Sequence, residues 1–224
     1  MSFAAFFDDA AIFPPGDASM AAAVAAHLAR RALPDGRYVG PFVCSAARLG
    51  ELAAALGDEL LDVAIVGTPP RTAPAGITVV AIELSGPVTS VPAHPRVFVE
   101  RSWDEPLDVP DGAMLKLRCG GAHVPSSCQL GEAIAHCVRN RVPFKLTAGL
   151  HHAVRTSGEH GFVNVLAAVW AAMEGSDPVP LLLEDDPEAL EIGDLAAVRE
   201  LFCSIGTCSI DEPLTDLRAL GLVA

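Results

Sequence analysis

The chain has 224 residues, 51% of them hydrophobic, and a formal net charge of −13. This length suits a single domain with a substantial core, and the negative charge argues against nucleic acid or an anionic membrane surface as the main partner. No apolar run reaches the ~18 residues that a membrane-spanning helix needs. Six cysteines without a CxxC pair, and a start without a signal-peptide pattern, predict reduced thiols in the cytoplasm.

Hydrophobic periodicity predicts eight strands, several of them followed by helices. The strands are expected at residues 3–7, 38–45, 61–66, 77–84, 96–101, 114–119, 144–148 and 201–210. Helices are expected from a cap at Asp17 or Ser19 to about residue 32, at 46–56, 128–141, 162–173 and 213–220, and in short pieces within 178–197. This order is typical of the α/β class and predicts one TIM-like (β/α) barrel over residues 1–224.

Three connections between these strands depart from the barrel pattern. Residues 67–76, 85–95 and 102–112 are rich in proline and glycine and show no helical period. A parallel crossover normally takes a dozen or more residues. We therefore expect a trimmed barrel in which some crossover helices are missing, or a flank that is locally antiparallel.

The missing helices have a consequence for the outer surface of the barrel. Strands 61–66, 77–84 and 96–101 are apolar on both alternating faces, as in strands that are covered on both sides. Without helices, roughly a few hundred Å² of apolar surface would be wet, and a patch of that size usually marks a partner site. A second copy joined by a two-fold axis would cover it, so we expect a homodimer. The alternative is that the acidic segment 178–197 folds back over these strands.

Two of the predicted strand ends repeat one layout of apolar residue, lysine, leucine, polar residue, small residue and glycine. They are LKLRCG, which contains Lys116, and FKLTAG, which contains Lys145. Side chains alternate along a strand, so Lys145 and Thr147 share a face. A buried ammonium is unfavourable unless it is paired or neutralised. The repetition therefore favours a polar pocket at the barrel mouth over solvated lysines on edge strands.

Polar residues interrupt four successive apolar strands near the same end. They are Glu83, Glu100, Lys116 with Arg118, and Lys145 with Thr147. Barrel enzymes carry their chemistry at the carboxyl ends of the strands, so we interpret these residues as a catalytic site. Salt bridges that only stabilise the barrel are the alternative.

The two lysines raise a question of charge. Ammonium groups on neighbouring strands repel one another and burial disfavours charge, so one lysine should have a depressed pKa and attack carbonyls as a nucleophile. A neighbouring carboxylate would instead keep the lysine cationic for oxyanion stabilisation. We assign Lys145 as the reactive amine and Lys116 as its electrostatic partner. The acid–base candidates are Glu83, Glu100, His151 and His152.

A substrate anchor is expected in Arg118, which can hold a carboxylate or a phosphate. Further contacts to the substrate are expected from Asp8, Thr147, Arg155, His160, Asn164 and Ser209. Asp8 and Asp9 lie where a strand passes into a loop, and at least one of them is expected in a solvated turn. Ser209 lies in a small, hydroxylated run before a helix, which suits either an anion site or an ordinary helix start.

Histidines and cysteines give weaker signals. His151 and His152 are adjacent on an extended segment and should point to opposite sides, and neither HxH nor HExxH spacing occurs. We therefore expect no metal and no other cofactor, with His and Asp ligands to a metal as the alternative. Cys119 and Cys208 lie near strand ends and are the candidates for reactive thiols.

Several segments together resemble an uncharacterised bacterial family of barrel-like proteins. They are residues 12–15 (IFPP), 41–49 (PFVCSAARL), 115–121 (LKLRCGG), 144–152 (FKLTAGLHH), 160–165 (HGFVNV) and 204–220. The resemblance runs nearly end to end and implies a barrel. Relatives look longer around Glu83 and Glu100, with helical crossovers where this chain has short links, which implies that this chain is a trimmed version. The resemblance implies no activity.

Together these features predict a small, cofactor-independent enzyme that acts on a carbonyl-bearing anionic metabolite through its paired lysines. The expected reaction is that of a lyase of aldolase type or of an isomerase. One alternative is a metal-assisted hydrolase with His and Asp ligands, and the other is a non-catalytic barrel used as a binding module. A metal analysis separates the two kinds of enzyme, and a pocket without converging polar groups would favour the binding module.

Overall fold

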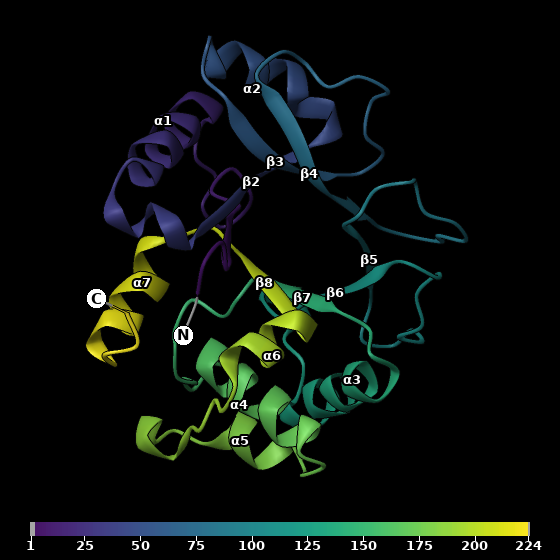
Figure 1. Cartoon of the computed structure of the whole chain (residues 1–224), viewed down its shortest axis with the longest axis vertical. Coiled ribbons are helices and arrows are strands. Elements are labelled where there is room, and N and C mark those ends of the chain that lie inside the picture. Colours follow the sequence, from purple (N-terminus) through teal and green to yellow (C-terminus); the bar gives the residue numbers. More distant parts are fainter. Residues whose placement is uncertain (1–2, 224) are drawn as a thin grey trace.

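The computed structural model describes residues 3–223, and within them eight parallel strands close into a barrel in sequence order (Figure 1). The strands are β1 (Phe7–Asp9), β2 (Val39–Ser45), β3 (Leu61–Val66), β4 (Ile77–Leu84), β5 (Val97–Arg101), β6 (Met114–Arg118), β7 (Phe144–Thr147) and β8 (Phe202–Thr207). The barrel closes where β1 pairs with both β2 and β8. The predicted TIM-like α/β barrel is confirmed.

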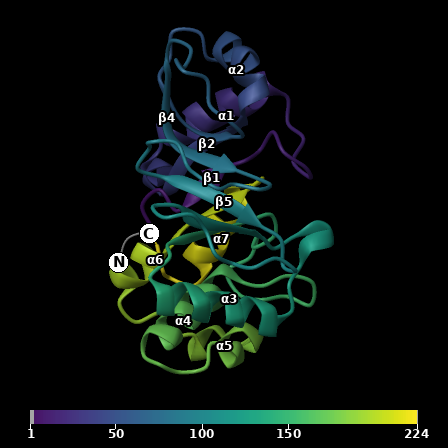
Figure 2. The same ribbon diagram turned by 90° about the vertical axis from the view of Figure 1, so that its right-hand side faces the viewer.

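Helices cover the barrel on two sides and leave a flank between them. They are α1 (Met20–Arg31), α2 (Leu49–Leu56), α3 (Ser127–Asn140), α4 (Phe162–Met173), α5 (Val179–Leu183), α6 (Leu195–Leu201) and α7 (Asp211–Ala219). Figures 1 and 2 show α1 and α2 at one end of the molecule and α3 to α6 at the other. The Ser19 side chain accepts a hydrogen bond from the Ala22 N–H and starts α1 as predicted.

The flank from β3 to β6 has no crossover helix in the described chain, as the trimmed barrel requires. All strand pairs there are parallel, so the locally antiparallel alternative is wrong. The links carry covering side chains of their own. Trp103, Leu107 and Val109 of the β5–β6 link pack against the main core, and the His94 ring lies 3.2 Å from the carbonyl oxygen of Val79 on β4.

Most of the residues on which the expected homodimer was based are buried, and those of β3 pack against α1 and α2. Val97 and Val99 of β5 are fully buried, as are Val63 and Ile65 of β3. The expectation of a large wet patch is therefore wrong for β3 and β5, whereas Val79 and Val80 of β4 are half-buried. A homodimer through another surface stays a prediction.

The alternation of side chains divides the barrel wall into an outer apolar layer and a polar interior. Leu115 and Leu117 of β6 belong to the core shared with α3 and α4, and Phe144 and Leu146 of β7 do the same. The residues between them therefore face the barrel axis. A separate interior cluster of Val43, Ala64, Ala81 and Phe98 fills the barrel next to these polar residues.

The first strand begins four residues later than predicted. Ala5 has a positive φ of 47°, which interrupts an extended segment, and β1 starts at Phe7. Phe3 and Phe6 are buried in the core instead. Asp8 and Asp9 consequently belong to the strand, with 2% and 1% exposure, so the expected solvated turn is wrong.

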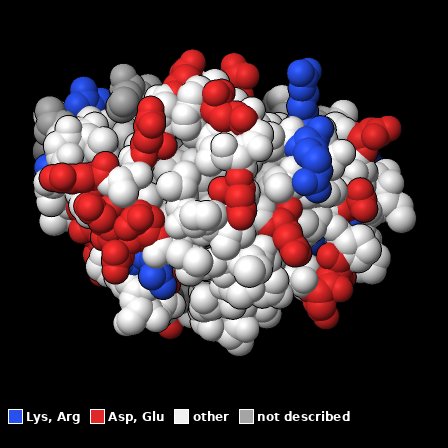
Figure 3. All heavy atoms as spheres, turned by 90° about the horizontal axis from the view of Figure 1, so that it is seen from below, with Lys and Arg blue, Asp and Glu red and all other residues white. Residues whose placement is uncertain are grey.

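The described chain contains no helix that is both long and apolar enough to cross a membrane. Its acidic residues outnumber its basic ones, 28 to 15, which gives the net charge of −13. Figure 3 shows acidic side chains spread over one face, where basic side chains gather in fewer places.

Candidate active site

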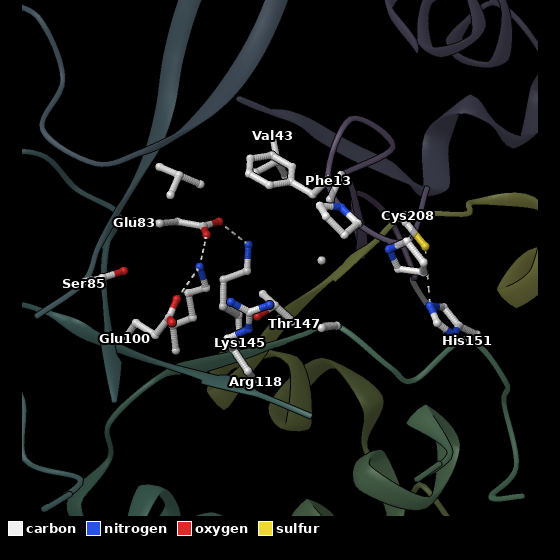
Figure 4. A pocket seen from close by; sticks show the side chains of 17 residues that line it. Phe13, Val43, Glu83, Ser85, Glu100, Arg118, Lys145, Thr147, His151 and Cys208 are labelled. Atoms are coloured by element: carbon white, nitrogen blue, oxygen red, sulfur yellow. Dashed lines mark hydrogen bonds and ion pairs between the residues drawn. The ribbon is translucent and has the colours of Figure 1, made fainter. Parts of the chain in front are cut away.

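A cavity of about 200 Å³ opens at the carboxyl ends of the strands. Figure 4 shows Glu83, Lys145 and Arg118 on one side of it and His151 with Cys208 on the other. The loop after β1 forms part of its wall through Phe13, Pro14 and Pro15. The predicted site residues that line it are Glu83, Glu100, Lys116, Arg118, Lys145, Thr147 and His151.

Five charged side chains form a row of alternating sign in the barrel interior. The Lys145 ammonium lies 2.5 Å from Asp8 Oδ2 and 2.6 Å from Glu83 Oε1. The Lys116 ammonium lies 2.7 Å from Glu83 Oε2 and 2.8 Å from Glu100 Oε2. The order is thus Asp8, Lys145, Glu83, Lys116 and Glu100, which we call the ion row. The prediction that both lysines lie in one pocket is confirmed, and one carboxylate joins them.

Pairing of neighbouring strands explains how the row arises. β6 and β7 pair with Lys116 opposite Lys145, and β5 and β6 pair with Glu100 opposite Lys116. The repeated lysine layout therefore places both ammonium groups at one level of the barrel. The carboxylates of β1 and β4 then reach the lysines through the barrel interior.

The ion row differs in exposure from one end to the other. The side chains of Lys145 and Asp8 are 0% and 3% exposed, and Glu83 is 2% exposed. Lys116 is 8% exposed, and Glu100 reaches 22%. The Asp8 end is therefore sealed inside the protein, whereas the Glu100 end meets the cavity and solvent.

Burial alone would raise the pKa of Glu83, but the ammonium groups of Lys116 and Lys145 outweigh it and bring the pKa to about 2. Burial alone would likewise lower the pKa of Lys145. The charges and hydrogen bonds of Asp8 and Glu83 outweigh it and raise that pKa above its ordinary value. The expectation of a depressed lysine pKa is therefore wrong for Lys145, because two buried carboxylates, and not only a second lysine, surround it.

Two further contacts fix the Lys145 end of the row. The Ser204 hydroxyl donates a hydrogen bond of 2.8 Å to Asp8 Oδ2, the oxygen that also faces Lys145. The Lys145 ammonium lies 5.3 Å from the centre of the Phe98 ring, within the range of a cation–π contact. Lys145 is therefore held on several sides in one position.

Arg118 is the exposed cation of the cavity. It follows Lys116 by two residues on β6, and so lies on the same face of the strand, nearer the mouth. Within residues 3–223, no carboxylate forms a salt bridge with its guanidinium. A guanidinium in this state can take a carboxylate or phosphate of a ligand in two parallel hydrogen bonds.

The opposite side of the cavity carries a cysteine and a histidine. His151 Nε2 lies 3.6 Å from Cys208 Sγ, and His151 Nδ1 lies 3.2 Å from the Glu159 carboxylate. The hydrogen bond with Cys208 raises the pKa of His151, burial opposes it, and the charge of Glu159 adds to it. The pKa of His151 is about 9 as a result.

An unusual backbone positions His151. Ala148, Gly149 and Leu150 follow β7 with φ values of 56°, 72° and 59°, a left-handed run that residues other than glycine rarely adopt. A Cβ on Gly149 would lie 2.5 Å from the Cys119 carbonyl oxygen, and one on Gly120 would lie 2.5 Å from the Gly149 nitrogen. The glycine of each repeat therefore lets the two strand ends pack backbone against backbone.

His151 and His152 point to different sides, as predicted. The His152 ring is half exposed and lies 3.2 Å from the Asp216 carboxylate of α7. His152 therefore contacts a surface helix, and in the described chain only His151 of the pair lines the cavity.

Five predicted substrate contacts lie outside the cavity lining of the described chain, and one of them, Asp8, is sealed in the ion row below the cavity. The other four have structural partners. Buried Asn164 accepts a hydrogen bond from the Arg155 N–H and donates two of 2.7 Å to backbone carbonyls of residues 181 and 184. The Arg155 guanidinium donates to the Leu183 carbonyl. The buried His160 ring contacts the Pro125 carbonyl, and the Ser209 N–H donates to Thr207 Oγ1. These residues tie loops to helices, which accounts for their polarity without a substrate.

Histidine and aspartate residues that were considered for a metal have other partners. Within residues 3–223, no three His, Cys, Asp or Glu side chains are grouped so that they could hold a metal ion. The Asp9 carboxylate lies 2.9 Å from the His27 ring on α1, on the outer side of the barrel. Asp8 and Asp9 thus serve opposite faces of one strand.

Two residues that contact the predicted site residues were not among the candidates from the sequence. Ser204 contacts Asp8 and Glu159 contacts His151, and both contacts arise only in the folded chain. Of the two reactive thiols considered, Cys119 is buried, and burial raises its pKa. Cys208 lines the cavity.

Comparison with known proteins finds no matching family model, curated protein or solved structure. The resemblance to an uncharacterised bacterial family stays a prediction, and any function has to be argued from the site.

Proposed function

We propose that the protein is an enzyme that forms a Schiff base between a buried lysine and a small, carbonyl-bearing anion, in the manner of an aldolase-type lyase or an isomerase. The observation that carries this proposal is the ion row, in which two lysines share the Glu83 carboxylate at the wall of a cavity. Barrel stability alone gives no reason for two buried ammonium groups, since buried ion pairs contribute little net stability compared with apolar residues.

Lys116 is the better nucleophile of the two in this proposal, and Lys145 becomes its electrostatic partner. Attack on a carbonyl requires a neutral amine. Lys145 is fully buried between two carboxylates, which hold it in the charged form. Lys116 shares Glu83 with Lys145, and its second partner, Glu100, is 22% exposed. Lys116 can therefore pass its proton to Glu100, at the end of the row that meets the cavity.

The reaction would begin with that proton transfer. The neutral Lys116 nitrogen then attacks the carbonyl carbon, and one of the two protons on the attacking nitrogen passes to the carbonyl oxygen, which gives a neutral carbinolamine. Glu100, now protonated, returns a proton to this oxygen as water leaves, and the product is a protonated imine. This cation occupies the former place of the ammonium beside Glu83, whose pKa of about 2 keeps it ionised. Removal of a proton from the neighbouring carbon gives an enamine, the intermediate that lyases and isomerases share.

Arg118 supplies the contact to the anionic part of the substrate. It lies on the same strand face as Lys116, and its guanidinium has no carboxylate partner within the described chain. The rest of the protein is strongly acidic, so a local cation is needed to hold an anion at the cavity. The proposal therefore concerns small carbonyl compounds with a carboxylate or phosphate group.

The cellular setting is part of the proposal. All six cysteines are free, which suits a reducing compartment such as the cytoplasm. The polar groups converging on the cavity favour an enzyme over a non-catalytic binding module. No ligand set among residues 3–223 favours the metal-assisted hydrolase.

Proton exchange in D₂O tests the proposed function. The protein is incubated with small 2-oxo acids and phosphorylated hydroxyketones, and NMR follows the loss of protons next to the carbonyl. We expect exchange of at least one compound well above the rate in buffer. Lys116→Arg keeps a cation beside Glu83 and Glu100 but cannot form the imine, and should lower the rate by roughly a hundred-fold or more. Exchange at the buffer rate for every compound, or an unchanged rate in Lys116→Arg, would refute the proposal.

A further inference from the structure

We propose that Cys208, His151 and Glu159 form a second covalent centre in the same cavity, where the Cys208 sulfur captures the carbonyl carbon of small aldehydes. This inference stands on residues of the β7 and β8 loops and does not depend on an imine at either lysine. It concerns a nucleophile that the proposed Schiff-base reaction leaves unused.

The three side chains have the order of a nucleophile, a proton-transfer group and an orienting carboxylate. Cys208 Sγ lies 3.6 Å from His151 Nε2, and Nδ1 on the other side of the ring lies 3.2 Å from the Glu159 carboxylate. Glu159 also accepts a hydrogen bond of 3.4 Å from the His151 backbone N–H. This carboxylate therefore fixes both the position and the orientation of the ring, which is the arrangement that activated thiols require.

The groups around His151 favour the protonated form of its ring. The His151 ring is positively charged at neutral pH, since it lies between Cys208 and Glu159, and Glu212 adds a further negative charge nearby. An imidazolium at hydrogen-bond distance stabilises a thiolate, the form in which cysteine is a nucleophile. The three residues directly before His151, which are Ala148, Gly149 and Leu150, have left-handed backbone conformations. This strained segment places the His151 ring beside Cys208.

The other cysteines provide a comparison within the same chain. Burial raises the pKa of four thiols, those of Cys44, Cys119, Cys137 and Cys203. Cys128 is exposed on α3 and lies outside the cavity lining of the described chain. Cys208 is half-buried and lines the cavity together with His151. If solvent access alone decided reactivity, Cys128 would be the more reactive thiol. If His151 activates the neighbouring sulfur, Cys208 is the more reactive one.

The covalent step needs no co-reactant. The Cys208 thiolate attacks the aldehyde carbon, a sulfur–carbon bond forms, and the electron pair of the C=O double bond moves onto oxygen. The oxygen takes the Nε2 proton of the His151 imidazolium. The products are a neutral hemithioacetal and a neutral imidazole, and the reverse step restores the ion pair and the free aldehyde.

Alkylation rates of single cysteines test the proposal. The full-length protein is treated with iodoacetamide at neutral pH, and mass spectrometry of peptides follows Cys208 and Cys128 separately. We expect Cys208 to react at least roughly ten-fold faster than Cys128 despite its lower exposure. His151→Gln should remove this advantage and leave the Cys128 rate unchanged. Circular dichroism and thermal unfolding confirm that the variant is folded, and Glu159→Gln, which keeps the ring, should give an intermediate rate.

Protection by an aldehyde tests the ligand class. Propanal should slow alkylation of Cys208 and not that of Cys128, and removing the aldehyde should restore the rate. The same protection is expected in Lys116→Arg, so that an imine at Lys116 cannot account for it, and the two proposals fail separately. The proposal is overturned if Cys208 reacts no faster than Cys128, if His151→Gln keeps the fast rate, or if propanal gives no protection in Lys116→Arg.

Discussion

Lys145 and Lys116 share the carboxylate of Glu83, yet their second partners give the two ammonium groups different surroundings. Asp8 is buried and also accepts a hydrogen bond from Ser204, whereas Glu100 is partly exposed. Removing a partner from a fully buried ion pair leaves an uncompensated charge in the protein interior, while a solvated partner can be hydrated again. The two lysines should therefore contribute differently to stability and to chemistry.

Methionine substitutions at the two lysines separate these contributions. Lys145→Met leaves Asp8 and Glu83 without their shared cation, and we expect it to lower the free energy of unfolding by about 3–5 kcal/mol. Lys116→Met removes a cation from both Glu83 and Glu100, but Glu83 keeps Lys145 and Glu100 is already partly hydrated, so a loss of about 1–2 kcal/mol is expected. Urea unfolding at neutral pH measures both. An equal or larger loss in Lys116→Met would contradict the order of burial along the ion row.

The stability contributed by His151 should depend on pH in a defined direction. The pKa of His151 rises on folding from its ordinary value near 6.5 to about 9, chiefly through Cys208 and with help from Glu159 and Glu212. A raised pKa means that the contribution is complete below about pH 6.5 and is lost as the pH rises through about 9.

His151→Gln provides the reference for this measurement. The difference in unfolding free energy between the native protein and the variant should shrink across that window, by about 1–2 kcal/mol after allowance for the solvent exposure of the ring. A difference that stays constant or grows towards alkaline pH would show that the ring is not held as an imidazolium.

At the scale of elements, the sequence predicts the strands and helices well because hydrophobic alternation and caps are local signals. It also predicts the lysine pair, since parallel neighbours with one layout bring equivalent residues to one level. The contact of His151 with Cys208 could not be predicted from the sequence. It depends on positive φ angles at Ala148 and Leu150, and neither alanine nor leucine indicates such a conformation. The orientation of Asp8 towards the barrel interior could not be predicted either, because it depends on the start of β1 at Phe7.

A glycine pair tests the packing of the β6 and β7 ends. Gly149 and Gly121 both have positive φ, 72° and 63°, but a Cβ would meet the Cys119 carbonyl only at Gly149 and would find open space at Gly121. Gly121→Ala should therefore cost about 1 kcal/mol for the backbone alone. Gly149→Ala should cost about 2–4 kcal/mol, because strain from the close contact is added. Chemical unfolding of both variants is the measurement, and equal costs would argue against the close backbone contact.

At the scale of the whole molecule, the barrel closes although three successive crossovers lack helices. Even so, the first three residues of β5 are buried, as are the first three of β7. The two flanks of the barrel are covered differently. Helices α3 to α6 form a packed layer on one flank, whereas the links on the other contact the core through a few side chains. Local opening follows the number of such buried contacts.

Hydrogen exchange should reveal this difference. We expect backbone amides of β4 and β5 to exchange faster than those of β7 and β8, by roughly ten-fold or more, because a link opens locally at a lower free energy than a helical layer. Mass spectrometry of peptides covering residues 77–84, 97–101, 144–147 and 202–207 follows the exchange. Equal protection on the two flanks would mean that the links are as firmly packed as the helices. Sedimentation at micromolar concentration would show in addition whether the predicted homodimer forms.

Trapping with borohydride is the most direct test of the proposed Schiff base. The protein is mixed with the carbonyl compound that shows the fastest proton exchange, reduced, digested and mapped by mass spectrometry. We predict a stable adduct on Lys116 that is absent in Lys116→Arg, and an unmodified Lys145, because its ammonium is sealed between Asp8 and Glu83. An adduct on Lys145 would reverse the roles of the two lysines, and the absence of an adduct on either lysine would contradict Schiff-base chemistry at this site.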